Sequence, residues 1–348
     1  MSHRILLTGA SGYLGGAILA RLAEASLPAH DKVYALVRTT EQSEAVRKYG
    51  FEPISVQVAA APALRKAIVD ARISIVIFTI DAGSFSSQGH FIDALAEVKD
   101  LTGNDVHFID TSGAKLFSSH SGARTDEELP DDSPAMFELQ KAQKPLIRPL
   151  QQALDANNKV IEHGEICGVK TYIFVPCIVY GEGTGFGNKI SIQTVAIVKA
   201  AKALQSVRSV DNGRPTWPVC HLSDTTNLYL GLLAAILAGA NPGQGRDGYY
   251  LAASGSIPWE DIYTAFAEAL AVRGVIHDSN VKLATEEELT TMAKGLGCPK
   301  ELVSLQLGGS CRLVARNAAT LGWLPAHKPE HILEAADAEV ELMLKHLA

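Results

Sequence analysis

The segment with the clearest chemical potential is a glycine-rich run near the start, Thr8-Gly9-Ala10-Ser11-Gly12-Tyr13-Leu14-Gly15-Gly16. It lies between an apolar run, Ile5-Leu6-Leu7, and an amphipathic stretch over 13–25. Glycines at this spacing permit a tight turn, close approach of a pyrophosphate and close packing of a helix on a sheet. A glycine-rich turn can also serve packing alone, but its place at a first strand–helix junction favours a dinucleotide-binding loop. The residues predicted to contact the cofactor here are Thr8, Gly9, Ser11, Gly12, Tyr13, Leu14 and Gly15.

The residues after the second expected strand bear on which dinucleotide binds. NAD-selective sites of this kind usually carry an acidic side chain there, which accepts hydrogen bonds from the ribose hydroxyls. Here the strand ends Val37-Arg38-Thr39-Thr40, without an acid. The Arg38 guanidinium can form a forked, charge-assisted contact with a 2′-phosphate, and the Thr39 hydroxyl can add to it. An arginine at a strand end is common without any ligand, but the missing acid favours NADP(H) over NAD(H).

Five further landmarks follow the glycine run in a characteristic order. They are Phe108-Ile109-Asp110-Thr111-Ser112-Gly113, Lys159-Val160-Ile161-Glu162, Val175-Pro176-Cys177-Ile178-Val179-Tyr180-Gly181, His221-Leu222-Ser223-Asp224 and Leu321-Gly322-Trp323-x-Pro325. With them, the chain resembles the extended and atypical short-chain dehydrogenases/reductases over most of its length. It is most similar to a group of uncharacterised, largely fungal proteins of the NAD-dependent epimerase/dehydratase type. The resemblance implies a Rossmann-type fold and a nicotinamide cofactor, but no particular substrate.

The resemblance also implies roles for individual residues. Ser112 matches the active-site serine, which hydrogen-bonds a substrate carbonyl, although a serine there can equally cap the loop after its strand. Lys159 matches the lysine that holds the nicotinamide ribose. Pro176 and Ile178 belong to the segment beside the nicotinamide, and Tyr180 ends it. Val175 stands where this segment usually has an arginine.

The chain departs from the family at its acid–base tyrosine, which precedes the lysine by four positions. Asp155 occupies that position, and no tyrosine occurs between Tyr49 and Tyr172. A carboxylate is shorter than a phenol and is normally ionised at neutral pH, so Asp155 is no simple replacement. As an i,i+4 pair on one helix, Asp155 and Lys159 can also form an ordinary surface salt bridge. Water, Ser112 or Tyr180 are the other candidates for the missing acid.

Other polar residues leave two interpretations open. Thr79 and Asp81 follow the fourth expected strand and are candidates for the cofactor ribose, although an aspartate there can also cap a turn. His221 and Asp224 precede a helix, which favours a cap or a tether over catalysis for Asp224. His120 and His163 show no ligand spacing, so no metal site is predicted.

The expected elements would bring these residues together. In the first half, near-continuous Ile/Val runs alternate with amphipathic helices, as a parallel sheet covered on both faces requires. The strands are expected at 5–7, 32–37, 53–58, 73–79, 106–109 and 171–175. Helices are expected at 13–25, 41–49, 63–71, 91–99 and 146–165. Segment 113–145, rich in Ser, Asp, Pro and Gly, is expected to be a long loop above the ligand crevice.

The second half is less regular. Strands are expected at 217–222 and 249–252, and helices at 194–205, 225–238, 259–272, 286–294 and 331–347. The predicted fold is therefore an α/β, Rossmann-type doubly wound parallel sheet with a smaller C-terminal substrate lobe. The dinucleotide-binding domain is expected to comprise 1–180 with 216–253, and the substrate lobe 181–215 with 254–348. Candidate apolar walls of the substrate site are Phe186, Ile190, Trp217 and Trp259.

Composition excludes several classes of protein. A length of 348 residues suits one large α/β domain with an appended lobe. The net charge is −7, without any run of like charges, and predicts no nucleic-acid partner. The five cysteines are scattered and include no Cys-x-x-Cys pair, which argues against a disulfide framework. The chain starts directly with a strand, and the longest apolar stretch, near 228–238, is shorter than a membrane span, so we expect a cytoplasmic protein without membrane contact.

These observations predict an NADP(H)-dependent oxidoreductase that reduces a small, hydrophobic carbonyl compound by hydride transfer. Two alternatives stay open because the acid–base tyrosine is missing. One is a redox-neutral epimerase, dehydratase or isomerase that keeps NADP bound. The other is a non-catalytic, NADP-binding redox sensor. The expected partners are a small-molecule substrate and a second copy of the chain in a homodimer.

Overall fold

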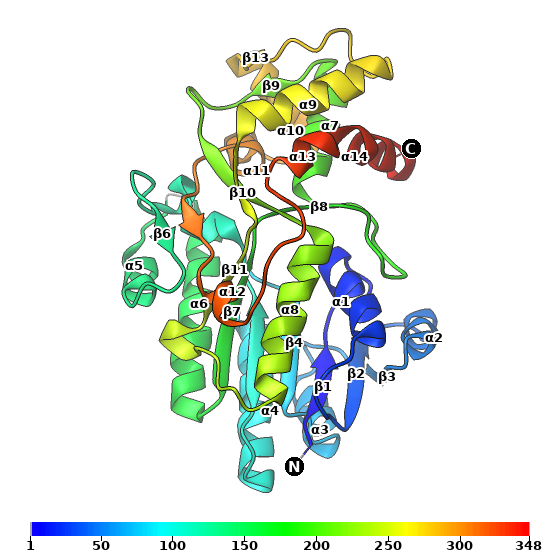
Figure 1. The fold of residues 1–348 in the computed structure, drawn as a ribbon, viewed down its shortest axis with the longest axis vertical. Helices are drawn as coiled ribbons and strands as arrows, with labels where there is room; N and C mark the ends of the chain where they lie inside the picture. Colours follow the sequence, from blue (N-terminus) through cyan, green and yellow to red (C-terminus); the bar gives the residue numbers. More distant parts are fainter. Residues whose placement is uncertain (1, 146, 348) are drawn as a thin grey trace.

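The computed structural model describes residues 2–145 and 147–347, and its main element is a seven-stranded sheet (Figure 1). The strand order is β11-β7-β5-β4-β1-β2-β3, and all neighbours are parallel. Its strands are β1 (Arg4–Leu7), β2 (Lys32–Val37), β3 (Glu52–Ser55), β4 (Ile75–Phe78), β5 (His107–Thr111), β7 (Lys170–Pro176) and β11 (Tyr249–Ala252). The strand order reverses between β1 and β4: β2 and β3 are added on one side of β1, and β4, β5, β7 and β11 on the other. The ligand crevice of this Rossmann-type sheet therefore lies above the carboxyl ends of β1 and β4.

Helices cover both faces of the sheet because its strands are apolar on both sides. On β1, Leu6 points into one core, while Ile5 and Leu7 point into the other. One face carries α1 (Tyr13–Glu24), α2 (Thr40–Lys48) and α8 (Leu222–Leu237). The other face carries α3 (Ala61–Asp70), α4 (Phe85–Thr102) and α6 (Arg148–Cys167). The predicted doubly wound α/β fold is thereby confirmed.

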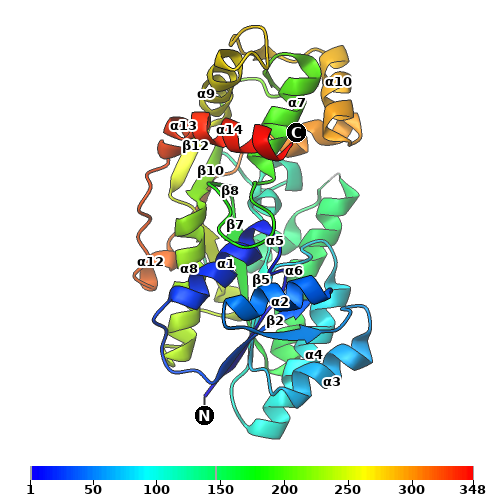
Figure 2. The same ribbon diagram turned by 90° about the vertical axis from the view of Figure 1, so that its right-hand side faces the viewer.

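A smaller lobe sits beyond the carboxyl ends of the strands (Figure 2). Three strands, β8 (Ile178–Tyr180), β10 (Thr216–His221) and β12 (Gly255–Pro258), form a separate sheet in the order β12-β10-β8. The lobe's main helices are α7 (Gln193–Leu204), α9 (Trp259–Val272), α10 (Glu286–Leu296) and α14 (Ala336–His346), with the short strands β9 (Arg208–Ser209) and β13 (Lys282–Leu283) above them. The sequence-based division put β8 and β10 in the dinucleotide domain; in the structure β8 pairs with β10, and β10 pairs with β12, within this smaller sheet.

Segment 113–145 is not the featureless loop that the sequence predicts. It contains two short 3₁₀ helices, η1 (Ala114–Phe117) and η2 (Ser119–Ser121), the strand β6 (Leu129–Pro130) and the helix α5 (Met136–Ala142). β6 pairs with β14 (Leu313–Val314), from the far end of the chain. The helix expected from position 146 starts at Arg148, and Leu146 lies outside the described residues.

The remaining short elements complete the lobe and its connections. The helix expected over 331–347 is divided into α13 (His331–Glu334) and α14. The others are η3 (Gly245–Asp247), η4 (Lys300–Leu302), α11 (Val303–Leu307) and α12 (Asn317–Thr320). None of the helices in the described part of the chain combines the length and apolar character that crossing a membrane requires.

Candidate functional site

Two cavities open at the carboxyl ends of the strands, on either side of the glycine turn. The larger, of about 640 Å³, is lined by Gly12 to Gly15, the ends of β4 and β5, and part of α6. We call it the Ser112 cavity. The second, of about 620 Å³, is lined by Gly9 to Ser11, the end of β2 and Arg38. We call it the Arg38 cavity. Ile80 lines both, so the two cavities adjoin at the end of β4.

The glycines of the turn are required by close backbone contacts. Gly9 has a φ of +67°, and a Cβ there would lie 2.4 Å from Thr79 Oγ1. A Cβ on Gly15 would lie 2.2 Å from the Gly9 carbonyl oxygen. Gly12 precedes α1 and has no side chain to cap it, so the first-turn amides of α1 remain free for an anion. Since Gly12 to Gly15 line the Ser112 cavity, this helix start is directed at the crevice.

The Arg38 cavity joins the glycine turn to the end of β2. Gln42 Nε2 lies 3.3 Å from Ser11 Oγ, and Gln42 Oε1 accepts a hydrogen bond from the Arg38 amide at 2.9 Å. The Arg38 side chain is exposed, and within the described residues it forms no ion pair. Thr39 was predicted to contact the cofactor, but it does not line this cavity. Its hydroxyl instead caps α2 by accepting a hydrogen bond from the Gln42 amide.

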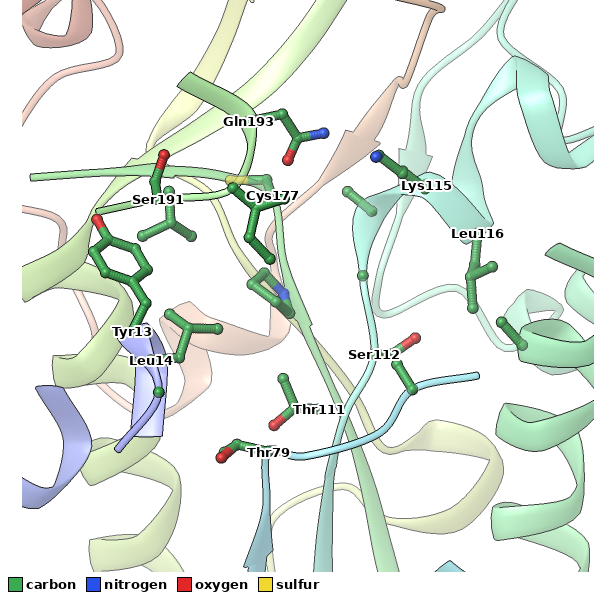
Figure 3. A pocket seen from close by; sticks show the side chains of 18 of the residues that line it. Tyr13, Leu14, Thr79, Thr111, Ser112, Lys115, Leu116, Cys177, Ser191 and Gln193 are labelled. Carbon is green, nitrogen blue, oxygen red and sulfur yellow. The ribbon is translucent and has the colours of Figure 1, made fainter. Parts of the chain in front are cut away.

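Ser112 lines the cavity (Figure 3), and it is hydrogen-bonded to an asparagine behind it that sequence reasoning missed. Asn157 Nδ2 donates to Ser112 Oγ at 2.8 Å, and both residues are buried. Because Ser112 Oγ accepts this bond, its own proton is free to be donated to an oxygen in the cavity. Ala153, four positions before Asn157, lines the same cavity. On this side of α6, Ala153 therefore faces the crevice, while Asn157 lies behind Ser112 without lining the cavity.

Lys159 and Asp155 do not lie in the crevice, which corrects their predicted roles. Both side chains are exposed and neither lines a cavity. Asp155 accepts a hydrogen bond from Gln151 Nε2 at 2.8 Å, and the structure shows no ion pair between Asp155 and Lys159. The physical reason is helical periodicity: two positions along α6 turn a side chain by about 200° around the axis. The sequence spacing that selected Asp155 and Lys159 therefore pointed to the face of α6 that is turned away from the crevice.

Tyr180 is also not in the cavity. Along β8 successive side chains alternate, so Val179 lines the cavity and Tyr180 points away from it. Its side chain is fully buried, and its hydroxyl lies 3.0 Å from His331 Nδ1. Burial raises the pKa of this phenol above its usual value. Ile178 is likewise a core residue and lines neither cavity.

Further predicted residues divide between the cavity and its supports. Pro176, Thr79 and Asp81 line the Ser112 cavity. Thr79 Oγ1 donates to the Thr8 carbonyl at 2.7 Å, while Asp81 Oδ1 accepts from the Gly83 amide at 2.8 Å. Thr8 itself is fully buried and ties β1 to β4, so it does not contact the crevice. Of the candidate apolar walls, Trp217 lines the Ser112 cavity and Phe186 the Arg38 cavity.

Lys115, at the edge of the same cavity, was not predicted from the sequence. It belongs to η1, and its side chain is directed into the cavity, as is that of Gln193 (Figure 3). Burial lowers the pKa of Lys115 to about 8. The only early signal was its place three residues after Ser112 in a segment expected to be a loop.

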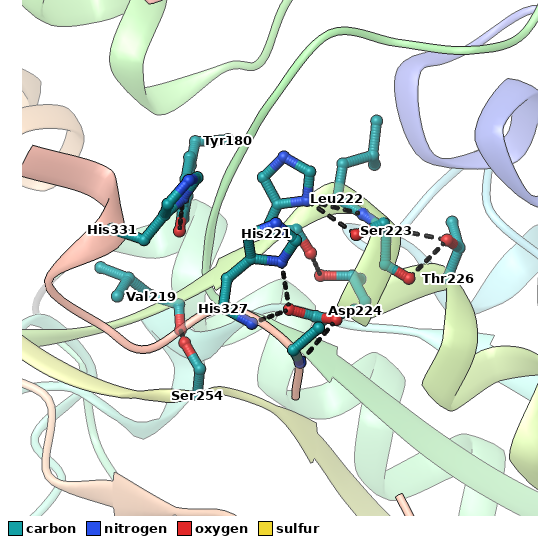
Figure 4. A network of polar contacts seen from close by, with 12 residues as sticks. Tyr180, Val219, His221, Leu222, Ser223, Asp224, Thr226, Ser254, His327 and His331 are labelled. Carbon is teal, nitrogen blue, oxygen red and sulfur yellow. Dashed lines mark hydrogen bonds and ion pairs between the residues drawn. The ribbon is translucent and has the colours of Figure 1, made fainter. Parts of the chain in front are cut away.

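Asp224 is a tether, as the sequence favoured, and not a catalytic residue (Figure 4). Its carboxylate accepts from the Ala326 and His327 amides, each at 3.0 Å, and contacts His327 Nδ1 at 2.8 Å. His221 caps α8, and its ring lies against that of His327 in a tilted arrangement with ring centroids 4.0 Å apart. Burial, with a contribution from His327, lowers the pKa of His221 to about 4, so the His221 ring is neutral at pH 7.

His163 has neighbours that its sequence spacing did not reveal. Its Nε2 lies 2.6 Å from Asp93 Oδ1, on α4, and 3.6 Å from Cys167 Sγ, one turn along α6. These three residues line neither cavity, and they take no part in the site described above.

Comparisons with known proteins agree with this geometry. The model of the NAD dependent epimerase/dehydratase family matches residues 5–244. An uncharacterised protein from Schizosaccharomyces pombe is 25% identical over 343 residues, which cover 96% of this chain and 99% of that protein.

Solved structures show the same fold over nearly the whole chain. UDP-glucose 4-epimerase from Thermotoga maritima, with UDP-glucose, has a TM-score of 0.64 at 14% identity, covering 99% of this chain and 100% of that one. dTDP-glucose 4,6-dehydratase from Bacillus anthracis, in complex with NAD, has a TM-score of 0.62 at 11% identity, covering 98% and 97%. Identities this low establish a shared architecture and leave the substrate open.

Proposed function

Because this chain belongs to the NAD dependent epimerase/dehydratase family, we propose that it is a nicotinamide-dependent enzyme that reduces a small carbonyl compound. The observation that carries this proposal is the pair of adjoining cavities around the glycine turn. A dinucleotide needs room for two nucleosides joined at a pyrophosphate, and the two cavities meet where the uncapped start of α1 offers free amides. The residues present therefore fit such a cofactor.

The two cavities differ in chemistry, which supports a different role for each. The Arg38 cavity would hold the adenosine half, with Arg38 and Ser11 near its ribose. The Ser112 cavity would hold the nicotinamide between Pro176 and the end of β5, with the substrate beyond it. A nicotinamide cofactor supplies a hydride when bound. Ser112 then donates its hydroxyl hydrogen bond to the substrate oxygen, and Asn157 keeps that hydroxyl oriented.

The preference for NADP(H) is a finer part of the proposal and rests on Arg38. A 2′-phosphate would give its exposed guanidinium a charge-assisted partner, and the end of β2 has no acid to hold the ribose hydroxyls. Arg38→Glu removes a charge-assisted hydrogen bond worth ~1.5–3 kcal/mol, so it should weaken NADPH binding by about tenfold to a hundredfold. It should leave NADH binding nearly unchanged. Calorimetric titration with both cofactors measures this. Arg47→Glu, an exposed charge reversal on α2 that lines neither cavity, is the matched control.

The reductase assignment is tested by screening aldehydes, enones, quinones and ketones while following NADPH absorbance. We expect slow turnover on generic carbonyls, because a positioned acid typically contributes ~10²–10⁴ in rate. Tyr13 is the one tyrosine among the described residues that line this cavity, and its hydroxyl is already donated to the Gly181 carbonyl. Ser112→Ala should lower turnover at least tenfold without changing NADPH affinity, whereas Ser304→Ala on α11 should change neither. If NADPH binds tightly and no substrate is reduced, the reductase proposal fails, and product formation without net NADPH loss would assign a redox-neutral reaction instead.

A further inference from the structure

The Ser112 cavity contains a cation without a counter-ion. Lys115 is the only lysine or arginine among its described lining residues, and Asp81 is the only carboxylate. Asp81 is engaged with the Gly83 amide, and the two side chains form no ion pair. Within the described residues, the Lys115 ammonium has no hydrogen-bond acceptor either. A charged group on an apolar wall is costly unless a ligand pairs with it.

Other groups around the cavity also offer donors to a ligand. Trp217 lines the cavity, is 1% exposed, and its indole Nε1 has no hydrogen-bond partner in the described part of the chain. α7 starts at the opposite rim, where Ser191, Ile192 and Gln193 line the cavity. The first turn of α7 carries no acidic residue of its own, but the buried Glu339 carboxylate accepts a hydrogen bond from Thr194 Oγ1 in that turn, so this helix start adds no free positive end. The Lys115 ammonium and the Trp217 indole are therefore the groups that favour an acceptor-rich, negatively charged ligand.

The rest of the cavity wall is mostly apolar. Its side chains include Leu14, Ile80, Leu116, Leu150, Val179 and Ile192. A ligand that fills the cavity must therefore combine one anionic group with a hydrophobic body. Lys115 follows Ser112 by three residues, through the turn into η1, so a carboxylate on Lys115 and a carbonyl on Ser112 can belong to one small molecule.

We propose that Lys115 binds the carboxylate of the substrate, so that the substrate class is a hydrophobic oxo acid or the corresponding hydroxy acid. The reacting carbonyl in this inference rests on the proposed function, whereas the carboxylate site is inferred from the residues that line the cavity. Lys115 acts here as a binding residue, and Gln193, from the opposite rim, is placed to donate to the second carboxylate oxygen (Figure 3).

Ligand binding tests the site without needing turnover. The probe is 4-phenylbutyrate, and its uncharged match is 4-phenylbutanamide, each titrated calorimetrically into protein saturated with NADP⁺. The wild type should bind the acid at least tenfold more tightly than the amide. Lys115→Met should remove this preference and Lys115→Arg should keep it. Lys144→Met, which removes an exposed charge outside both cavities, is the control and should change nothing.

The pH dependence gives a second readout. Burial lowers the pKa of Lys115 to about 8 when no ligand is bound, so affinity for the acid should fall as pH rises above that value, while affinity for the amide stays level. Besides Lys115, the titratable side chains among the described residues that line this cavity are Tyr13, Asp81 and Cys177. None of them pairs with Lys115. Equal affinity for acid and amide in the wild type, or an unchanged preference in Lys115→Met, would overturn the proposal.

The same titrations separate this inference from the proposed function. They are repeated without cofactor, and NADPH binding is measured on its own. Loss of all nicotinamide binding with an intact acid preference would refute the enzyme proposal alone. Normal NADPH binding without an acid preference would refute only the carboxylate site. If Lys115→Met instead slows reduction of an oxo acid and its methyl ester equally, Lys115 is a proton donor and the carboxylate assignment is wrong.

Discussion

At the scale of single residues, the site depends on which face of α6 meets the crevice. Asn157 donates to Ser112, whereas Lys159 is exposed to solvent two positions away. The family's tyrosine–lysine spacing is thus filled on this side of α6 by Ala153, which lines the cavity, and by Asn157, which lies behind Ser112. Neither side chain can transfer a proton as a phenol does. The end of the cavity around Ser112 is therefore built on hydrogen-bond donors with little capacity for acid catalysis.

This placement gives a direct comparison of two variants. Asn157→Ala should destabilise the protein by about 1–3 kcal/mol, because the buried Ser112 hydroxyl loses its donor. It should also slow turnover, since Ser112 would no longer be oriented. Lys159→Ala should leave stability and NADPH affinity unchanged. Urea unfolding and cofactor titration measure both, and weakened NADPH binding in Lys159→Ala would restore the role that the sequence suggested.

Asp110, under the crevice on β5, makes a prediction about pH. It is fully buried, neither carboxylate oxygen has a hydrogen-bond partner in the described residues, and burial raises its pKa to about 7. Between pH 3.8, the pKa of this group in the unfolded chain, and about pH 7, Asp110 is therefore protonated in the folded state but ionised in the unfolded state. This contribution to stability is complete below the unfolded value and is lost as pH rises through the folded one.

Asp110→Asn should remove that loss. At pH 8 the variant should be more stable than the wild type, by up to ~4 kcal/mol from the size of the pKa shift. At pH 4 the difference should nearly vanish, because both forms of the site are then neutral. Urea unfolding at several pH values measures the difference. A wild type that is as stable as the variant at pH 8 would show that the carboxylate finds a partner when it ionises.

At the scale of elements, the junction of β1 and α1 is the most constrained part of the fold. α1 can approach the glycine turn only because Gly15 has no side chain. Gly15→Ala would place a methyl group 2.2 Å from the Gly9 carbonyl oxygen, so helix and turn must separate. We expect a stability loss of at least ~1–3 kcal/mol and loss of nicotinamide binding.

The control is another helical glycine. Gly231, inside α8, has no atom within 4 Å of an added Cβ. Gly231→Ala should therefore stabilise the protein by roughly 0.5–1 kcal/mol, from helix propensity alone, and leave cofactor affinity unchanged. Melting temperatures and NADPH titrations compare the two variants. Equal behaviour would mean that the turn tolerates separation from the helix.

At the scale of the whole molecule, the C-terminal helix holds the lobe to the crevice. Glu339 on α14 is 4% exposed, and its carboxylate accepts from the Gly181 amide at 2.7 Å and from Thr194 Oγ1 at 3.4 Å. One side chain thereby joins the last segment of the chain to the end of β8 and the start of α7. Because Val179 on β8 and Gln193 on α7 line the Ser112 cavity close to these contacts, Glu339 fixes the position of this rim of the cavity.

Breaking that contact should affect the entire lobe. Glu339→Ala leaves a buried amide without an acceptor and should cost about 1–3 kcal/mol or more. Glu341→Ala, two positions along the same helix and exposed, should change stability by less than ~0.5 kcal/mol. Denaturant unfolding compares them. If both variants unfold at the same denaturant concentration, α14 does not secure the lobe.

Much of the architecture follows from local patterns. Apolar runs alternating with amphipathic helices predicted the doubly wound sheet, and β11 and α9 have the bounds that the sequence indicated. The glycine turn was also predictable, because its requirements are backbone requirements that only glycine meets. Local periodicity is sufficient for such features, since it determines which stripe of each element is buried.

The sequence alone did not determine which polar side chains meet in the crevice. Ser112, Asn157 and Lys115 come together because β5, α6 and η1 converge there, and a shift of two residues on α6 separates Asn157 from Lys159. The elements of segment 113–145 are likewise unpredictable locally, since β6 exists by pairing with β14 near residue 313. Residue spacing predicts which side chains lie on the same helix. With 3.6 residues per turn, however, only the packing of the helix against the rest of the protein decides which of its faces is turned towards the crevice. The family and fold could therefore be inferred from the sequence, whereas the choice of polar side chains at the crevice was decided by tertiary packing.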